Sequence, residues 1–384
     1  MTGRMPSEIA LRNNETTHID NVADEIKNQG AGWLFRKAGY DPVYAGKVHL
    51  PKLTPQDIGF DFIESDQRDK LADTCAEWIR QPHRRPFFLV ASFINPHDIC
   101  YMTIRDSQQD ERERHLVKHG TIECQTLDRA LVRPSGVSEE AFFSMHCPPL
   151  PKNFEPQTDE PEGIRQILEQ WPFRTMARRE WDEHRWREHR WAYARLTEMV
   201  DAQIGRVLEA LRESGLDHNT VVIFTSDHGD MDSAHRMDNK ITLYEEACRI
   251  PLIISQRGTT HEGTVNATDV VSNGLDLLPT LCDYAGIDPP GDLHGTSLRP
   301  LAESRGSDCW RSSIPVESKF GRAVVSSGFK YVLYEQGAYR EQLYDLRRDP
   351  GETRNAAHDK VNQDVLKRMR EEYEHQFSSE QGAR

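Results

Sequence analysis

Two predicted strands each end in side chains that can bind metal ions or anions. Residues 221–226 are uncharged β-formers in a run too short for a buried helix, which predicts a strand covered on both faces. Asp227 and His228 follow this run directly. Residues 87–94 form a second run of this kind, and His97 comes soon after it. In open α/β sheets ligands bind beyond the carboxyl ends of the strands, so the pattern predicts a functional site, with a simple polar turn as the alternative.

Further cationic groups extend this set of candidates. Residues 40–49 read as a strand that enters a loop, and residues two apart in an extended segment point the same way, so Lys47 and His49 are expected to project together. The alternative is a solvent-facing strand end. Lys240 lies in the polar stretch that follows Asp227. Ammonium, imidazole and carboxylate groups in this combination suit a tetrahedral oxyanion bound beside a divalent cation. The sequence contains neither glycine pattern of the common phosphate-binding loops.

Apolar spacing predicts the elements that position these residues. We expect helices over residues 20–39, 66–80 and 187–214, each with apolar side chains at helical spacing. The strand at 87–94, the helix at 187–214 and the strand at 221–226 would form a βαβ crossover with parallel strands. Residues 100–185 show no clear period and predict an irregular insertion with one helix near 162–170. These patterns indicate an α/β fold with a mostly parallel central sheet flanked by helices.

The pattern changes near residue 310. Short alternating strands at 323–326, 330–335 and 341–345 predict an antiparallel meander, and residues 361–377 predict a terminal amphipathic helix. A strand at 251–255 and helices at 242–248 and 269–286 precede this change. We therefore expect an α/β domain over residues 1–305 and a small α+β antiparallel subdomain over residues 306–384.

Composition narrows the classes of function. The chain has 384 residues and a formal net charge of −14, which argues against nucleic acid as the main partner, although a local basic pocket can still bind an anion. Its seven cysteines include no Cys-x-x-Cys pair, so a zinc cluster is not expected. Every apolar run is much shorter than the ~18 residues that a membrane span needs. The sequence leaves the oligomeric state and compartment open; a signal peptide upstream of Met1 would make the protein periplasmic or secreted.

Several motifs, in order along the chain, resemble those of the sulfatase family in the alkaline phosphatase superfamily. The motifs are Gly46-Lys47-Val48-His49, Asn95-Pro96-His97-Asp98, Thr225-Ser226-Asp227-His228-Gly229-Asp230 and Gln342-Leu343-Tyr344-Asp345-Leu346 with Asp349-Pro350-Gly351-Glu352. The resemblance implies an alkaline-phosphatase-like fold with the antiparallel subdomain at its end. It also implies hydrolysis of a sulfate ester, with a formylglycine nucleophile and one divalent cation, most simply calcium.

The resemblance assigns roles to individual residues. Asp227 and His228 would be metal ligands, although histidine is less usual for calcium than asparagine at the second position. Lys47 and Lys240 would hold the sulfate oxygens.

The histidines receive separate roles in the same resemblance. His49 would assist the formylglycine, and His97 would protonate or stabilise the leaving oxygen. His235 would lie near the site and contact the substrate. The acid role suits an imidazole because its pKa lies close to neutral.

One part of the family pattern is missing from the chain. Sulfatases carry a Cys-x-Pro-x-Arg motif whose cysteine becomes formylglycine, followed by Thr-Gly-Arg, and this chain begins Met1-Thr2-Gly3-Arg4. We expect an upstream segment with the nucleophile, the first strand and two aspartate ligands. Residues 1–384 alone are then expected to show negligible turnover and poor stability. The alternative is that this chain is the protein as it is made in the cell, and that it binds a ligand without catalysis.

Three functions remain open at this stage. The first is hydrolysis of a sulfate ester on a sulfated small molecule or glycan, with a carbohydrate favoured by Asn95-Pro96-His97-Asp98-Ile99-Cys100. The second is hydrolysis of a phosphonate or phosphate ester by the same superfamily chemistry. The third is a non-catalytic protein that binds sulfated glycans.

Overall fold

The structure is a computed structural model, and it describes residues 1–9, 11, 22–50, 53–305 and 310–377. Contacts divide the chain into two compact units. Unit 1 contains Met1–Ile94, Val200–Ser226 and Pro251–Arg311, and unit 2 contains Asn95–Met199, Asp227–Ile250 and Ser312–Arg384. The proposed domain boundary between residues 305 and 306 stays a prediction.

Unit 1 is built on a parallel sheet, as the sequence predicts. The strand β1 (Asp41–Gly46) lies between β2 (Asp61–Glu64) and β3 (Phe87–Ser92), and both neighbours run parallel to it. The helices of the unit are α1 (Asp24–Asn28), α2 (Ala31–Lys37), α3 (Leu71–Arg80), α12 (Asn273–Ala285), α13 (Arg299–Ala302) and the last part of α10 (Glu183–Glu213). Parallel strands flanked by helices confirm the α/β class.

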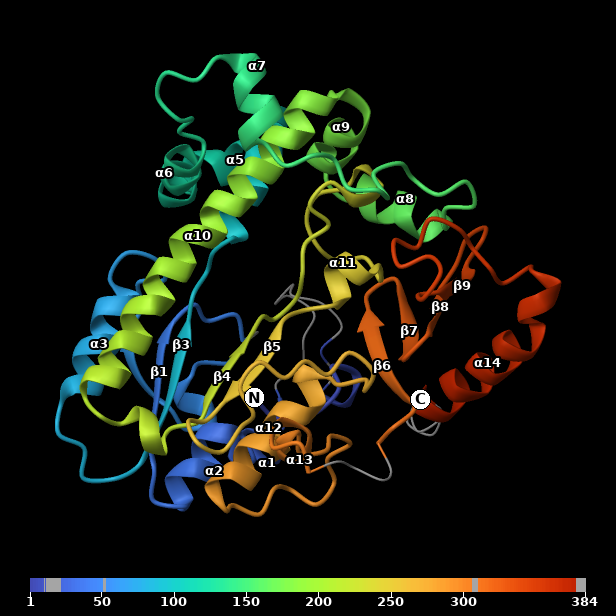
Figure 1. The fold of residues 1–384 in the computed structure, drawn as a ribbon. Coiled ribbons are helices and arrows are strands. Elements are labelled where there is room, and N and C mark those ends of the chain that lie inside the picture. Colours follow the sequence, from blue (N-terminus) through green and yellow to red (C-terminus); the bar gives the residue numbers. More distant parts are fainter. Residues whose placement is uncertain (10, 12–21, 51–52, 306–309, 378–384) are drawn as a thin grey trace. The chain divides into compact units, whose positions relative to one another are not determined.

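Alternating residues of β3 pack on opposite faces of this sheet, so both faces are covered. Phe87 and Leu89 pack against α3 and α10, whereas Phe88 and Val90 pack in the cluster that includes residues of α2 and α12. Successive side chains of a strand point to opposite faces, so a continuous apolar run can serve two helical layers. In Figure 1, β1 and β3 run side by side, with α3 beside them.

The prediction of a strand at residues 221–226 is confirmed, but its expected burial on both faces is wrong. The strand β4 (Val222–Thr225) pairs antiparallel with β5 (Leu252–Ser255) and has no ladder with β3 within the described residues, so its parallel orientation to β3 stays a prediction. The strand is not covered on both faces, because Phe224 is 38% exposed and Ile253 of β5 is 56% exposed. An apolar run predicts a strand, but its hydrogen-bonding neighbour is set by contacts distant in sequence.

Unit 2 contains the segment that we expected to be an irregular insertion with one helix near 162–170; the helix is confirmed, but the irregular character of the rest is wrong. The segment is mainly helical: α4 (Cys100–Ser107), α5 (Glu111–His119), α6 (Thr121–Ala130), α7 (Glu139–Ala141), α8 (Glu162–Glu169), α9 (Pro172–Glu180) and the first part of α10. Met102, Leu127, Met176 and Trp186 share one buried cluster. Short helices gain their stability from such packing rather than from intrinsic propensity. The many charged residues of this segment therefore leave no clear apolar period from which the helices could be predicted.

The C-terminal part of unit 2 confirms the predicted meander and adds one strand. The antiparallel sheet has the order β6 (Ser313–Ser318), β7 (Gly321–Ser326), β8 (Phe329–Tyr334) and β9 (Glu341–Asp345). The helix α14 (Gln363–Phe377) lies along this sheet in Figure 1, and Tyr331 of β8 contacts Tyr373 of the helix edge-on. Another short helix of this unit, α11 (Glu245–Cys248), precedes β5 in the chain.

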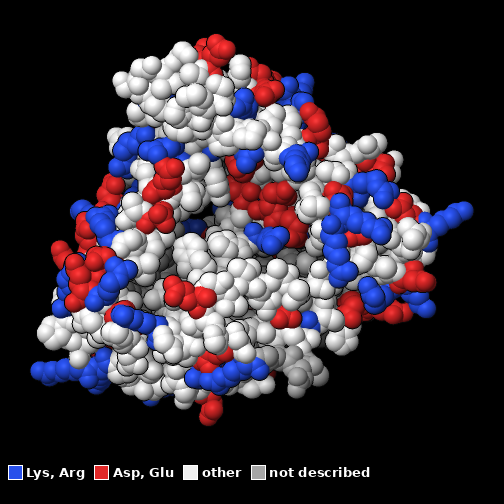
Figure 2. Space-filling view, viewed as in Figure 1, with Lys and Arg blue, Asp and Glu red and all other residues white. Residues whose placement is uncertain are grey.

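The charged surface and the character of the helices agree with a sequence that is rich in charge and has only short apolar runs. Figure 2 shows basic and acidic side chains interspersed on the face in view. Within the described ranges, no helix has both the length and the apolar character needed to cross a bilayer.

Candidate active site

The predicted metal ligands begin the part of unit 2 that follows β4. Gly229 fixes the backbone after Asp227 and His228, because its N–H donates to the carbonyl of Ala247 at 2.9 Å. A Cβ atom added to Gly229 would lie 1.9 Å from the carbonyl oxygen of Glu246, so only glycine allows this close approach to α11. The backbone that follows His228 therefore lies directly against the backbone of α11.

The ring of His228 is held in one tautomer. Its Nδ1 lies 2.7 Å from the carbonyl oxygen of Gly229. Since a carbonyl can only accept, Nδ1 must carry the proton, and Nε2 of the neutral ring is then an acceptor. Nε2 lies 3.6 Å from Oδ2 of Asp227, whose Oδ1 accepts from the His228 N–H at 3.1 Å. Both side chains reach solvent, with 59% of Asp227 and 37% of His228 exposed.

This pair fits a divalent cation in donor type but does not complete a ligand set. A carboxylate oxygen and an imidazole nitrogen 3.6 Å apart can face one ion. Calcium takes about six to eight ligands, which is more than two side chains provide. Among the residues that the structure describes, no group of three or more His, Cys, Asp or Glu side chains could hold a metal ion.

His97 and Lys240 lie in the same unit as this pair. His97 opens a 3₁₀ turn after β3, with its side chain 35% exposed and Nδ1 3.7 Å from Oδ1 of the buried Asp98. Thr103 of α4 donates to Oδ2 of Asp238 at 2.6 Å, which joins the His97 region to the segment carrying Lys240. Burial raises the pKa of the Cys100 thiol, and the Lys240 ammonium opposes that rise. The charge of Lys240 therefore acts close to the start of α4.

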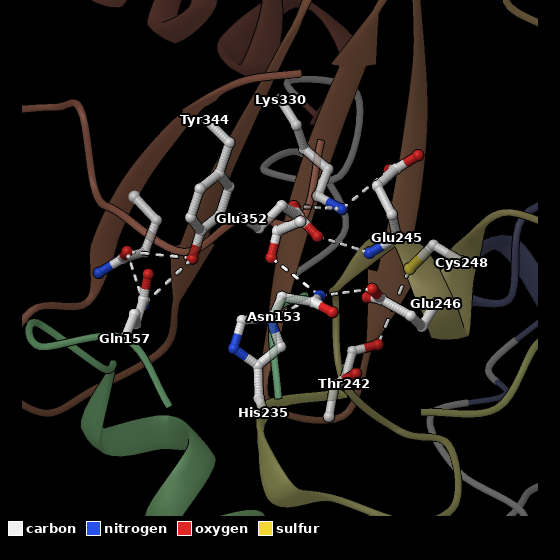
Figure 3. Close-up of polar contacts among 12 residues, drawn as sticks. Asn153, Gln157, His235, Thr242, Glu245, Glu246, Cys248, Lys330, Tyr344 and Glu352 are labelled. Carbon is white, nitrogen blue, oxygen red and sulfur yellow. Dashed lines mark hydrogen bonds and ion pairs between the residues drawn. The ribbon is translucent and has the colours of Figure 1, made fainter. Parts of the chain in front are cut away.

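His235 does not occupy the substrate-contacting position that we expected. It is fully buried, and its ring stacks on Tyr244 with centroids 4.1 Å apart and an angle of 13°. Its backbone N–H donates to the carbonyl of Asn153 at 2.7 Å, and Figure 3 shows the ring beside this asparagine. Burial lowers the pKa of His235 to about 4. A buried, neutral ring supports the surrounding segment and offers no surface to a substrate.

Lys47 and His49 belong to unit 1. Lys47 follows β1 directly, and its backbone N–H donates to the carbonyl of Ser92 at 2.7 Å, so it leaves the sheet beside the end of β3. Gly46 has φ +93°, and a Cβ atom there would lie 2.2 Å from the carbonyl oxygen of Ser92. Tyr44 donates its hydroxyl to the Lys47 carbonyl at 2.6 Å. His49 is exposed in the loop that follows.

Three acidic residues that follow Asp227 in the chain were missed at the level of sequence: Asp230, Asp232 and the buried Asp238. Burial raises the pKa of Asp230 to about 6, with His189 opposing the rise. Burial also raises the pKa of Asp238. His189 is fully buried, and its Nδ1 lies 3.6 Å from Oδ1 of Asp232. The signal for Asp230 was its place three residues after Asp227, but nothing in the sequence shows that folding raises the pKa of this aspartate.

The six described cysteines are free and poorly suited to act as thiolate nucleophiles. Burial raises the pKa of the thiol to about 12 in Cys75 and Cys248 and to about 11 in Cys147 and Cys282. A reactive thiol needs a lowered pKa and partial exposure.

Comparisons with known proteins agree with this fold and these motifs. The sulfatase family model matches residues 12–287, and a model described as N-sulphoglucosamine sulphohydrolase, C-terminal, matches residues 233–379. The chain is 28% identical to a Delta 4,5-hexuronate-2-O-sulfatase of Bacteroides thetaiotaomicron, in an alignment that covers 93% of this chain and 73% of that protein. An arylsulfatase of Clostridium perfringens is 38% identical over 161 residues, which is 41% of this chain and 33% of that enzyme.

A solved structure extends the likeness to three dimensions. The structure of BT1596, a 2-O GAG sulfatase, superposes with a TM-score of 0.81 at 26% identity, covering 100% of this chain and 81% of that one. The family model spans most of the chain, and the parallel sheet with its antiparallel C-terminal sheet agrees with it. The chain therefore belongs to the sulfatase family, a family of sulfuric ester hydrolases.

Proposed function

We propose that the protein hydrolyses sulfate esters of glycosaminoglycan saccharides, with 2-O-sulfated uronate as the first substrate to test. One observation carries the proposal: the relative aligned along 93% of the chain and the solved structure that covers all of it are both named as 2-O-sulfatases. The substrate is then a polyanion, and local cationic groups have to offset its charge in a chain that is acidic as a whole.

In this proposal Lys240 and Lys47 bind the sulfate oxygens, and their ammonium groups offset the negative charge in the transition state. His97 donates a proton to the leaving sugar oxygen. Its partial exposure allows contact with a substrate, and the carboxylate of the buried Asp98 lies 3.7 Å from its Nδ1.

Asp227 and His228 would hold a divalent cation, which we propose to be calcium. A cation bound there supplies positive charge that offsets the charge on the sulfate oxygens. The fixed tautomer of His228 supports this role because it presents Nε2 as an acceptor. His49, exposed beyond β1, is proposed to assist the formylglycine nucleophile that the family resemblance implies.

The proposal is tested with the full-length protein and an unsaturated disaccharide that carries a 2-O-sulfate on its uronate. We expect sulfate release, and Lys240→Ala is expected to lower kcat/KM by about 100-fold or more, as for loss of one preorganised donor. Lys118→Ala is the matched control, since Lys118 is exposed near the end of α5, and it should leave the rate unchanged.

Two other outcomes would overturn the proposal. Faster hydrolysis of nitrophenyl phosphate or a phosphonate ester than of any sulfate ester would favour a phosphonate or phosphate ester hydrolase. Tight binding of the sulfated disaccharide in isothermal titration, without turnover in the presence of calcium, would favour a sulfated-glycan binder.

A further inference from the structure

A buried ion triad in unit 2 lies between the C-terminal sheet and the segment that carries Asp227 and His228. Lys330 of β8 is fully buried, and its Nζ lies 2.7 Å from Oε1 of Glu352 and 3.0 Å from Oε1 of Glu245. Figure 3 shows the three side chains converging from three different parts of the chain. A buried charge is tolerated only when it is paired and hydrogen-bonded, so this arrangement fixes all three segments together.

Glu352 also makes a directed hydrogen bond to α11. Its Oε2 accepts from the backbone N–H of Glu245 at 2.6 Å, at the first residue of that helix. Tyr244, at the N-cap position, forms no side-chain cap. The Glu352 carboxylate therefore caps the N-terminus of α11 from a distant part of the chain, and a negative charge at the N-terminus stabilises a helix.

The backbone of Glu352 is itself unusual. Its φ is +52°, in the left-handed region that a residue with a side chain rarely adopts. Such a conformation persists only where the surroundings hold it, and it often marks a functional constraint. Burial raises the pKa of Glu352 to about 7, and the Lys330 ammonium opposes that rise. Burial would lower the pKa of Lys330, but the two carboxylates raise it above its usual value, so the ammonium stays charged.

A second connection secures the same two segments. Nδ2 of Asn153 donates to Oε1 of Glu246 at 2.6 Å and to the carbonyl of Gly351 at 3.0 Å, which bridges α11 and the turn that contains Glu352. The segment that carries Asp227 and His228 in turn contacts the α11 backbone, because the Gly229 N–H donates to the Ala247 carbonyl at 2.9 Å. A continuous chain of contacts thus runs from β8 to the residue after His228.

We infer that Glu352, held by Lys330, is a positioning residue that sets the place of Asp227 and His228 through α11. The inference rests on the proposed function only for its effect on catalysis. The positioning effect itself is a property of the fold and is measured without substrate.

The experiment compares amide hydrogen exchange in the full-length protein and three variants. Glu352→Ala removes the acceptor, Glu352→Gln keeps an oxygen that can accept from the Glu245 N–H, and Glu335→Ala removes an exposed carboxylate after β8 as a control. We expect Glu352→Ala to speed exchange at Gly229 by at least about 10-fold, with little change in the ladder between β7 and β8. Glu352→Gln should restore most of the protection, and Glu335→Ala should match the unchanged protein.

Catalysis gives a separate readout. If the full-length protein hydrolyses sulfate esters, Glu352→Ala should reduce kcat/KM by about 10-fold, and Glu352→Gln should recover most of that loss. Unchanged exchange at Gly229 in Glu352→Ala would refute the inference, and so would equal acceleration across the β7–β8 ladder, which indicates general loosening. If no sulfate ester is cleaved but the exchange pattern appears, the proposed function fails while the positioning role stands.

Discussion

Replacement of Gly229 by alanine tests whether the close approach of the segment after His228 to α11 is as tight as the structure describes. The new Cβ atom would lie 1.9 Å from the Glu246 carbonyl oxygen and 3.0 Å from its carbonyl carbon. Both are backbone atoms, so no side chain can rotate away to make room. The segment or α11 must move, and the hydrogen bond from the Gly229 N–H to Ala247 would lengthen or break.

The expected cost follows from three contributions. Overpacking of this kind costs about 1–3 kcal/mol. The lost hydrogen bond costs about 1 kcal/mol. Alanine restricts the unfolded chain and returns about 0.4–1 kcal/mol. Gly229→Ala is therefore expected to lower the free energy of unfolding by about 2 kcal/mol.

Gly205→Ala is the matched control for this substitution. Gly205 lies within α10, and a Cβ atom there would meet nothing within 4 Å. Alanine at such a helix position should raise the free energy of unfolding by about 0.5–1 kcal/mol. The two substitutions are chemically identical, so their opposite signs would isolate the packing at Gly229.

Urea unfolding followed by circular dichroism measures both variants, and hydrogen exchange of residues 228–231 locates the change. The reasoning is refuted if Gly229→Ala is at least as stable as the unchanged protein while Gly205→Ala shows its expected gain. A stability loss without faster exchange in residues 228–231 would also contradict it, because the disturbance would then lie elsewhere.

Two further predictions concern buried ionisable groups. The pKa of His235 is about 4 in the folded protein against 6.5 ordinarily, so its contribution to stability is present above pH 6.5 and is lost as the pH falls toward 4. This loss amounts to about 3 kcal/mol of the free energy of unfolding. The variant His235→Phe retains a ring to stack on Tyr244, and it should flatten the dependence of that free energy on pH, measured by urea unfolding. Parallel pH dependences in the variant and the unchanged protein would count against this prediction. The buried Asp276 accepts from Arg311 at 2.5 Å and from the Thr296 N–H at 2.9 Å, so Asp276→Ala should cost about 3–5 kcal/mol in urea unfolding. The exposed Asp288→Ala should change stability by less than about 0.5 kcal/mol, and equal effects of the two substitutions would disprove the buried role of Asp276.

Local pattern was sufficient to predict the elements whose stability depends on one apolar stripe or one alternating run. The helix α10, the strands β1 and β3 and the antiparallel strands β7–β9 all appear where the periodicity places them. The motifs around Asp227 and His97 also predicted the family, because they keep their order and residue types along the chain.

Only the tertiary structure decided which segments meet. The pairing of β4 with β5, the helices α4–α9 and the burial of His235 depend on contacts between residues far apart in sequence, which periodicity does not encode. The same holds for Glu352, which in the sequence is one acidic residue in a turn. Its contacts with Lys330 and the first N–H of α11 arise because folding brings together residues 245, 330 and 352 and excludes water from the charges they carry.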